Sequence, residues 1–212
     1  MKQSLLKYVL TASLPVLTLI TLPAHASTIF SENFETATVN LDVTQAGQFN
    51  TILGTNVDVV GGSNFGYLCV GPESGNCVDL GGTGGDAFGD LVTTITLAPG
   101  TYDLSFDLIG SQRGDTTSTT VSFGDYSQTF ILASSDTTSG IVLNQLVNVT
   151  GGPTTLQFLN NAYPGDDGNI GALLDNVSVT TTASPVPEPG TLAMMTTGLI
   201  GLAGAARRRF VA

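Results

Sequence analysis

Residues 102–108 read Tyr102-Asp103-Leu104-Ser105-Phe106-Asp107-Leu108. Apolar side chains alternate with short polar ones, which is the two-residue period of a strand that is buried on one face. Residues 91–97 show the same alternation, and the turn sequence Ala98-Pro99-Gly100 separates the two stretches. The pattern therefore predicts two strands joined by a tight turn.

The alternation recurs along the chain at a spacing of about ten residues, and helical periodicity is absent from residues 27–183. The predicted strands are rich in Thr, Val, Ile and Phe, and Gly, Asn or Asp lies between them. Besides the first two, they cover residues 28–34, 48–53, 57–60, 65–70, 76–80, 119–123, 126–132, 141–149, 154–160 and 170–180. Many short strands at this spacing predict an all-β antiparallel sandwich.

The first 26 residues differ from this body. They begin with Lys2 and Lys7, continue with an apolar segment at 8–22 and end with Ala24-His25-Ala26. This is the layout of a secretory signal peptide that signal peptidase cleaves after Ala26. An uncleaved N-terminal anchor is the alternative, but the apolar segment has 15 residues. A membrane span needs about 20.

Residues 184–212 form a tail with three parts. Val186-Pro187-Glu188-Pro189 is too rich in proline to extend a helix or a sheet. The uncharged residues 189–206 predict a transmembrane helix, although its length of about 27 Å falls short of a hydrocarbon core of ~30 Å. Arg207-Arg208-Arg209 follow, and they predict a cytoplasmic anchor at this end.

This three-part order resembles the PEP-CTERM sorting signal of Gram-negative bacteria. The resemblance implies recognition by an exosortase, which is a membrane-embedded processing enzyme. It also implies transient anchoring in the inner membrane and delivery to the cell surface or extracellular matrix. A span this short favours cutting of the tail over a permanent anchor. Removal of both ends leaves one domain, residues 27–183.

The charge of this domain excludes several functions. Arg113 is its only basic residue, against 16 acidic residues, so we expect no nucleic-acid partner. Histidine and lysine are absent from residues 27–183, which excludes Ser-His-Asp and Cys-His catalysis, imidazole ligands and Schiff-base lysines. Tryptophan is absent as well, so the rings left to stack on a sugar are Tyr67, Tyr102, Tyr126 and Tyr163.

The two cysteines, Cys69 and Cys77, flank a turn sequence that contains Gly71-Pro72. An exported chain meets an oxidising compartment, and an even cysteine count there indicates pairing. The sequence therefore predicts a hairpin closed by a disulfide, with two buried thiols as the alternative.

Two further stretches are similar to the first and last strands of galactose-binding-like jelly-roll domains. They are Phe30-Ser31-Glu32-Asn33-Phe34-Glu35 and Gly171-Ala172-Leu173-Leu174-Asp175-Asn176-Val177. The resemblance implies that these strands run side by side in a jelly-roll-like sandwich. It also implies a structural Ca²⁺ held by Glu32 or Glu35 together with Asp175, since carboxylate oxygens suit this ion. The alternative role for Asp175 is to accept hydrogen bonds from backbone N–H groups.

We therefore expect an exported, non-enzymatic protein of structural or carbohydrate-interacting type, with extracellular polysaccharide as a partner. The alternative is a carboxylate-based glycan hydrolase or lyase. Asp103 and Asp107 share one strand face but are about 13 Å apart by strand rise, which is too far for a catalytic pair. Arg113 is expected to pair with Asp115 or another carboxylate rather than with a ligand.

Overall fold

The computed structural model describes residues 26–71, 75–84, 88–165, 168–182, 194 and 197–201. The chain divides into two units, Ala26–Ala183 and the two ends Met1–His25 with Ser184–Ala212. The predicted signal peptide up to residue 25, the motif at 186–189 and the arginines at 207–209 lie outside the described residues. Residues 194 and 197–201 are helical, and no helix among the described residues is long and apolar enough to cross a membrane.

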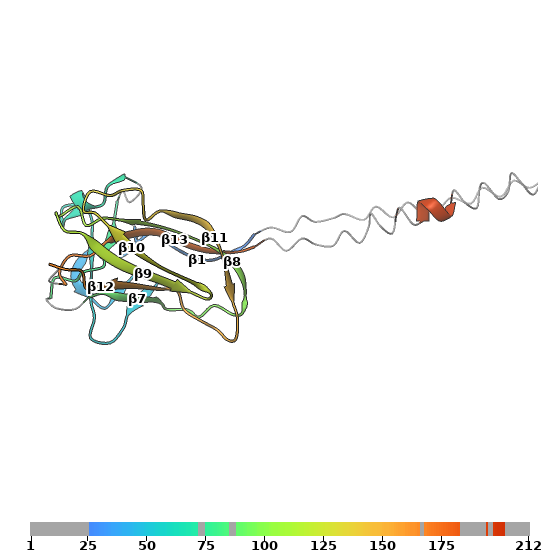
Figure 1. Cartoon of the computed structure of the whole chain (residues 1–212), viewed down its shortest axis with the longest axis horizontal. Helices are drawn as coiled ribbons and strands as arrows, with labels where there is room; N and C mark the ends of the chain where they lie inside the picture. The colour runs from blue at the N-terminus through green and yellow to red at the C-terminus, as the bar shows by residue number, and fades with distance from the viewer. Residues whose placement is uncertain are drawn as a thin grey trace, which may run out of the picture. The chain divides into compact units, whose positions relative to one another are not determined.

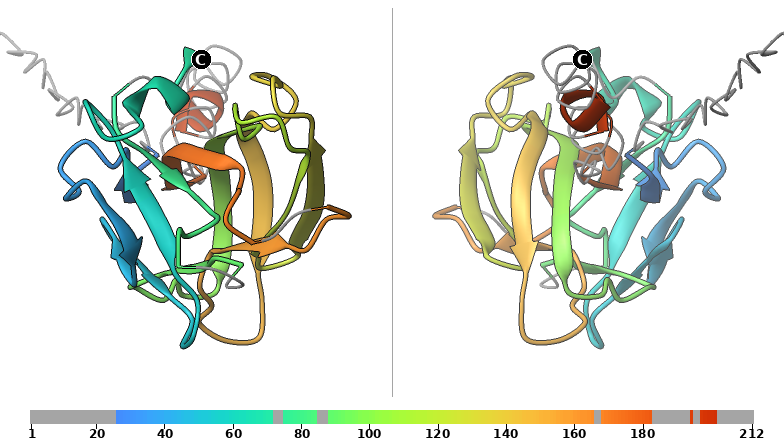
Figure 2. Two further views of the ribbon diagram at one scale, coloured as in Figure 1. Left: turned by 90° about the vertical axis from the view of Figure 1, so that its left-hand side faces the viewer. Right: turned by 90° about the vertical axis from the view of Figure 1, so that its right-hand side faces the viewer.

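The unit Ala26–Ala183 is built from two sheets of antiparallel strands, which Figures 1 and 2 show facing one another. Sheet A has the order β11 (Val142–Val149), β8 (Gly100–Ile109), β13 (Leu173–Thr181), β6 (Cys77–Asp79), β5 (Val57–Val60), β2 (Asn40–Val43), and β1 (Thr28–Glu32) also pairs with β13. Sheet B has the order β10 (Tyr126–Leu132), β9 (Thr117–Phe123), β12 (Gln157–Asn161), β7 (Asp90–Thr93), β4 (Phe49–Thr51), β3 (Gln45–Ala46).

Strand β8 shows how the alternation produces the sandwich. Tyr102, Leu104, Phe106 and Leu108 are buried between the sheets. There Phe106 meets Phe130 of β10 and Phe158 of β12. The ring centroids are 5.8 and 5.3 Å apart and the rings meet edge to face, which is a favourable aromatic geometry. The predicted all-β, jelly-roll-like antiparallel sandwich is confirmed.

The first and last strands lie side by side, as the resemblance implied. β1 pairs with β13 (Figure 1). In this pairing, Phe30 lies opposite Val179 and Glu32 opposite Val177. Consecutive strands also form the edges of the sandwich. β2 and β3 end their sheets on one side, and β10 and β11 end them on the other.

The prediction of a strand at residues 65–70 is wrong. A 3₁₀ helix, η1 (Gly66–Leu68), lies there instead. Phe65 has a φ of 58°, and a Cβ on Gly66 would lie 2.7 Å from the Gly61 carbonyl carbon, so the chain curls tightly at this point. Leu68 and Cys69 of this stretch are buried beneath the curl and do not lie in a sheet. Strands β2 and β3 were not predicted, because they are short and their alternation is weak.

Candidate functional site

A cap covers part of the outer face of sheet A. It comprises residues 61–77, of which 72–74 are not described, and we call it the disulfide cap. Cys69 and Cys77 form the predicted disulfide within it, with an S–S distance of 2.07 Å. The predicted hairpin is instead a connection from η1 to β6. Apolar side chains beneath the cap form a second hydrophobic cluster that includes Val60, Leu68, Ile109 and Leu173.

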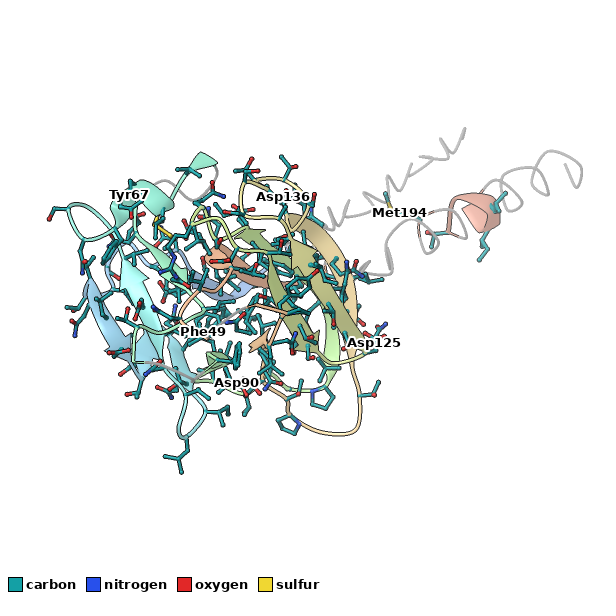
Figure 3. All side chains as sticks on the ribbon, turned by 60° about the vertical axis from the view of Figure 1, so that its left-hand side comes forward. Phe49, Tyr67, Asp90, Asp125, Asp136 and Met194 are labelled. Atoms are coloured by element: carbon teal, nitrogen blue, oxygen red, sulfur yellow. A yellow bond between two sulfur atoms is a disulfide. The ribbon has the colours of Figure 1, made fainter. Side chains whose placement is uncertain are left out.

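Two aromatic rings project from the disulfide cap into solvent. Phe65 is 42% exposed and Tyr67 is 69% exposed, and their ring centroids are 6.2 Å apart. Figure 3 shows Tyr67 on the outside of the sandwich and Phe49 in its interior. The backbone beneath the rings is held by the Leu68 N–H, which donates to the Phe65 carbonyl at 2.9 Å, and by the Cys69 N–H, which donates to Gly66 at 3.2 Å.

The other tyrosines suggested as stacking rings are less accessible than Tyr67. Tyr102 is buried in the core, and its hydroxyl donates to the Ala98 carbonyl at 2.8 Å. Tyr126 and Tyr163 are half-buried. Tyr67 is therefore the one of the four that offers a largely open ring.

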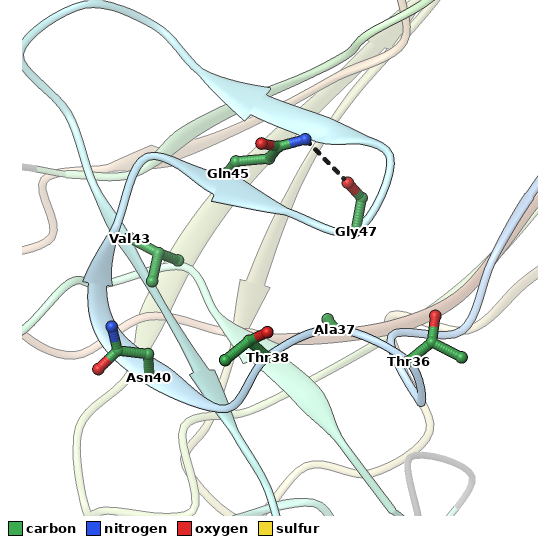
Figure 4. A pocket seen from close by; sticks show the side chains of 7 residues that line it. All are labelled: Thr36, Ala37, Thr38, Asn40, Val43, Gln45 and Gly47. Atoms are coloured by element: carbon green, nitrogen blue, oxygen red, sulfur yellow. Dashed lines mark hydrogen bonds between the residues drawn. The ribbon is translucent and has the colours of Figure 1, made fainter.

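A hollow of about 300 Å³ lies where the chain passes from sheet A to sheet B (Figure 4). Its lining has hydroxyl, amide and methyl groups but no ionisable side chain: Thr36, Ala37, Thr38, Asn40, Val43, Gln45 and Gly47. The Gln45 amide donates to the Gly47 carbonyl at 3.5 Å. The loop before the hollow is tied to the disulfide cap, because the Asn76 amide donates to the carbonyls of Phe34 and Glu35 at 3.3 and 3.4 Å.

The three predicted calcium ligands occupy one region, but each has its own backbone partner. Glu32 accepts the N–H groups of Phe34 and Gln48, both at 2.8 Å. Glu35 accepts the Asn76 N–H at 3.1 Å, and Asp175 accepts the Asn176 N–H at 2.6 Å. In the described ranges, no group of three or more His, Cys, Asp or Glu side chains is placed to hold a metal ion.

Asp175 is nevertheless unusual, because its side chain is 2% exposed and lies among other carboxylates. Burial raises the pKa of Asp175 to about 7. The Asn176 N–H opposes this rise, and the negative charges of Glu35, Asp107 and Glu32 add to it. The two-residue alternation places Asp107 on the polar face of its strand, and the register puts it opposite Asp175.

Arg113 forms an ion pair with Asp79, at 2.5 Å, and not with its sequence neighbour Asp115. The same guanidinium donates to the Asn169 carbonyl at 2.6 Å. Asp79 also accepts the N–H groups of Gly81 and Gly171, at 2.9 and 2.8 Å. Burial raises the pKa of Asp79 to about 7, and Arg113 and the two N–H groups limit that rise. Arg113 thus holds the loops around β6 and β13 together. The sequence predicted that Arg113 pairs with a carboxylate rather than with a ligand.

A family model described as the PEP-CTERM protein-sorting motif matches residues 185–209. These residues include the predicted motif at 186–189 and the arginines at 207–209. The chain therefore carries a PEP-CTERM sorting motif, and this motif implies an exported protein that is sorted through the membrane. The match does not extend into the sandwich.

Solved structures resemble the sandwich only distantly. The K1 cleaved adhesin domain of Lys-gingipain from Porphyromonas gingivalis aligns at 15% identity and a TM-score of 0.45, over 74% of this chain and 99% of that one. The CBM22-1 xylan-binding domain of Paenibacillus barcinonensis Xyn10C aligns at 14% identity and a TM-score of 0.41, over 75% and 97%.

An exo-beta-1,3-galactanase from Phanerochaete chrysosporium aligns at 17% identity and a TM-score of 0.35, over 72% of this chain and 29% of that one. The chain thus spans less than a third of that enzyme's length. The comparison with curated proteins gives no match. Because these TM-scores are below 0.5, we draw nothing about function from the likenesses.

Proposed function

We propose that the protein is a non-enzymatic component of the cell surface or extracellular matrix whose sandwich binds neutral carbohydrate. An exosortase recognises and cuts its tail, after transient anchoring in the inner membrane of a Gram-negative cell. The observation that carries the carbohydrate proposal is the exposed pair of rings, Phe65 and Tyr67, on the disulfide cap.

Sugar rings present C–H groups on their faces and hydroxyls around their rims. The faces of Phe65 and Tyr67 suit the C–H groups, because aromatic faces carry partial negative charge. The neutral hollow at the neighbouring loop offers hydroxyl and amide partners for sugar hydroxyls. A polysaccharide that carries negative charge would be repelled by the 16 acidic residues of the domain, so the proposal is limited to neutral glycans.

The backbone of Phe65 supports a functional role for these rings. Its φ of 58° lies in the left-handed region, which is uncommon for a bulky residue and costs about 1–3 kcal/mol. Such strain is typical of positions where a side chain is held for a purpose. Leu68 and the disulfide fix the cap from below, so the two rings lose little freedom when a ligand binds.

The acidic residues favour binding over hydrolysis. A carboxylate-based hydrolase needs two carboxyl groups that flank an accessible sugar. Two pairs of aspartates face one another across described strands of sheet A, Asp107 with Asp175 and Asp58 with Asp79, and all four are buried. No ionisable side chain lines the hollow. This arrangement supports a protein without enzymatic activity.

We also propose a structural Ca²⁺ ligated by Asp175 with Glu32 or Glu35. The proposal rests on the charge of this region and not on a preformed set of ligands: burial, with the negative charges of Glu35, Asp107 and Glu32, raises the pKa of Asp175. A divalent cation would neutralise this charge, and carboxylate oxygens are the ligands it prefers. The ion would join the end of β1 to β13.

Replacing Phe65 or Tyr67 by alanine is expected to weaken binding to a neutral polysaccharide about 3–10-fold for each ring. Affinity electrophoresis of the exported protein in gels with and without the glycan measures this. The matched control is Leu53→Ala, which removes a fully exposed apolar side chain from another loop. Unchanged binding by Phe65→Ala/Tyr67→Ala, with an unchanged melting temperature, would contradict the proposal. Release of reducing ends would favour the hydrolase.

A further inference from the structure

Three neighbouring strands of sheet B carry no charged residue. They are β9, β10 and β12, with the sequences TSTTVSF, YSQTFIL and QFLNN. On the outer face, short side chains pair across β9 and β10, with Ser122 opposite Ser127 and Thr120 opposite Thr129. This surface is neutral, although residues 27–183 contain 16 acidic residues.

Strand β10 is the last strand of this neutral surface, so one side of its backbone has no neighbouring strand. Phe123 and Tyr126 lie opposite one another across the turn Gly124-Asp125, which places them in a hydrogen-bonded pair. By alternation, the backbone N–H and C=O groups of Ser127, Thr129 and Ile131 point away from β9.

The open edge of β10 lacks the usual protection against pairing. Charges, prolines and bulges commonly protect edge strands, but β10 has no charge and no proline, and its register with β9 is continuous. Ile131 adds an apolar side chain that is 61% exposed beside this edge.

The other four strands that pair on one side only are covered, short or charged. β1 ends at the charged Glu32, and the Gln48 amide donates to its Ser31 carbonyl at 2.6 Å. On β11, Asp125 accepts the Asn148 N–H at 2.7 Å and donates its own N–H to the Asn148 carbonyl at 3.0 Å. The Gln145 amide donates to the Leu146 carbonyl of the same strand at 2.9 Å. β3 has two residues, and β2 contains Asp42. Among the described edges, β10 is therefore the one open to another strand.

We propose that β10 pairs with β10 of a second copy of this chain. The two strands would run antiparallel about a twofold axis at Thr129, with Ser127 of each opposite Ile131 of the other. A second copy fits this edge because a domain with the same excess of negative charge meets the least repulsion at an uncharged surface. The closed pairing leaves no further open edge, so assembly stops at a dimer.

Acidic groups near the interface are compatible with this register. Asp125 precedes β10 and Asp136 lies in the connection that follows it. In the proposed pairing, Asp125 lies opposite Ala133 of the second copy and not opposite its own counterpart. The inference goes beyond the carbohydrate proposal and does not depend on it.

Placing a charge at the twofold axis tests the interface. Thr129→Glu sets two carboxylates directly opposite one another and is expected to convert the dimer to a monomer. Ser122→Glu adds the same charge to the same face one strand away and is expected to leave the dimer intact. Sedimentation equilibrium of the full chain in detergent, with melting curves as a check on folding, measures both. A wild-type monomer at the highest soluble concentration, or a Thr129→Glu dimer, would overturn the proposal.

A cross-linking experiment tests the register without adding charge. Residues in a hydrogen-bonded antiparallel pair have Cα atoms about 5.5 Å apart, which is within the range that a disulfide spans. Thr129→Cys is therefore expected to give a covalent dimer on oxidation, seen on a non-reducing gel, whereas Ser122→Cys gives a monomer. Equal cross-linking of the two variants, or none of either, would exclude this pairing.

Discussion

Replacing Arg113 by methionine is expected to destabilise the sandwich by about 3–5 kcal/mol at pH 8, where most of Asp79 is ionised in the wild type. The variant leaves Asp79 buried, at 1% exposure, without its cation. No other lysine or arginine exists in residues 27–183 to take its place. Chemical denaturation of the wild type and the variant measures the loss. The double variant Arg113→Met/Asp79→Asn removes both charges and is expected to recover most of it, because a buried neutral amide is less costly than an unpaired charge.

The pH dependence of Arg113→Met provides a second readout. Burial already raises the pKa of Asp79 from 3.8 to about 7, and loss of Arg113 removes a contact that lowers it, so the pKa rises further. A folded-state pKa above the unfolded value means that the folded state binds more protons, so stability falls as pH rises between the two values. The variant should therefore be closer to the wild type at pH 5 than at pH 8. A loss that is equal at both pH values would contradict this account of Asp79.

Calcium at 100 times its dissociation constant is expected to stabilise the protein by about 2.7 kcal/mol, which corresponds to a rise in melting temperature of about 5–10 °C. Asp175→Asn should abolish this rise, because it removes a charged ligand from the proposed site. Asp115→Asn removes one negative charge elsewhere and should retain the full calcium effect. Melting curves at pH 8, with CaCl₂ or with EDTA, test all three proteins. An equal calcium effect in Asp175→Asn would exclude that residue as a ligand.

Without calcium, the raised pKa of Asp175 predicts that stability falls as pH rises. A carboxylate held in a salt bridge, whose pKa is lowered, would give the opposite trend. The pKa of Asp175 is raised from 3.8 to about 7 on folding, so metal-free stability should fall by about 2–4 kcal/mol as pH rises through that window. Metal-free Asp175→Asn should accordingly be more stable than the wild type at pH 8. A wild type whose metal-free stability rises over this window would contradict the assignment.

The sequence predicts the sandwich well wherever one strand face is apolar and a turn follows. Residues 57–60, between Asn56 and Gly61, and residues 126–132, after Gly124-Asp125, form strands with the predicted bounds. The prediction of a strand at 65–70 was wrong, because Leu68, Cys69 and Val70 pack in the cluster under the disulfide cap while the stretch curls into a 3₁₀ helix. The local pattern of apolar residues indicates that a side chain is buried, but it does not indicate which element covers that side chain.

Pairs that join distant strands could not be predicted. Arg113 meets Asp79 across 34 positions, and Asp107 lies opposite Asp175 only through the register of β8 with β13. In both pairs, a side chain that alternation places on an outer, polar face proves to be buried under loops. The disulfide was predictable, because its cysteines are 8 positions apart and have no competing partner.

The central claim is that the two ends of the chain direct the export of a sandwich that contains one disulfide. Intact-protein mass spectrometry of material from the cell surface and medium, with and without reduction, tests it most directly. We predict a chain that begins at Ser27, gains the mass of two hydrogens on reduction and lacks the arginines at 207–209. A soluble cytoplasmic chain of all 212 residues, with free thiols and both ends intact, would contradict it.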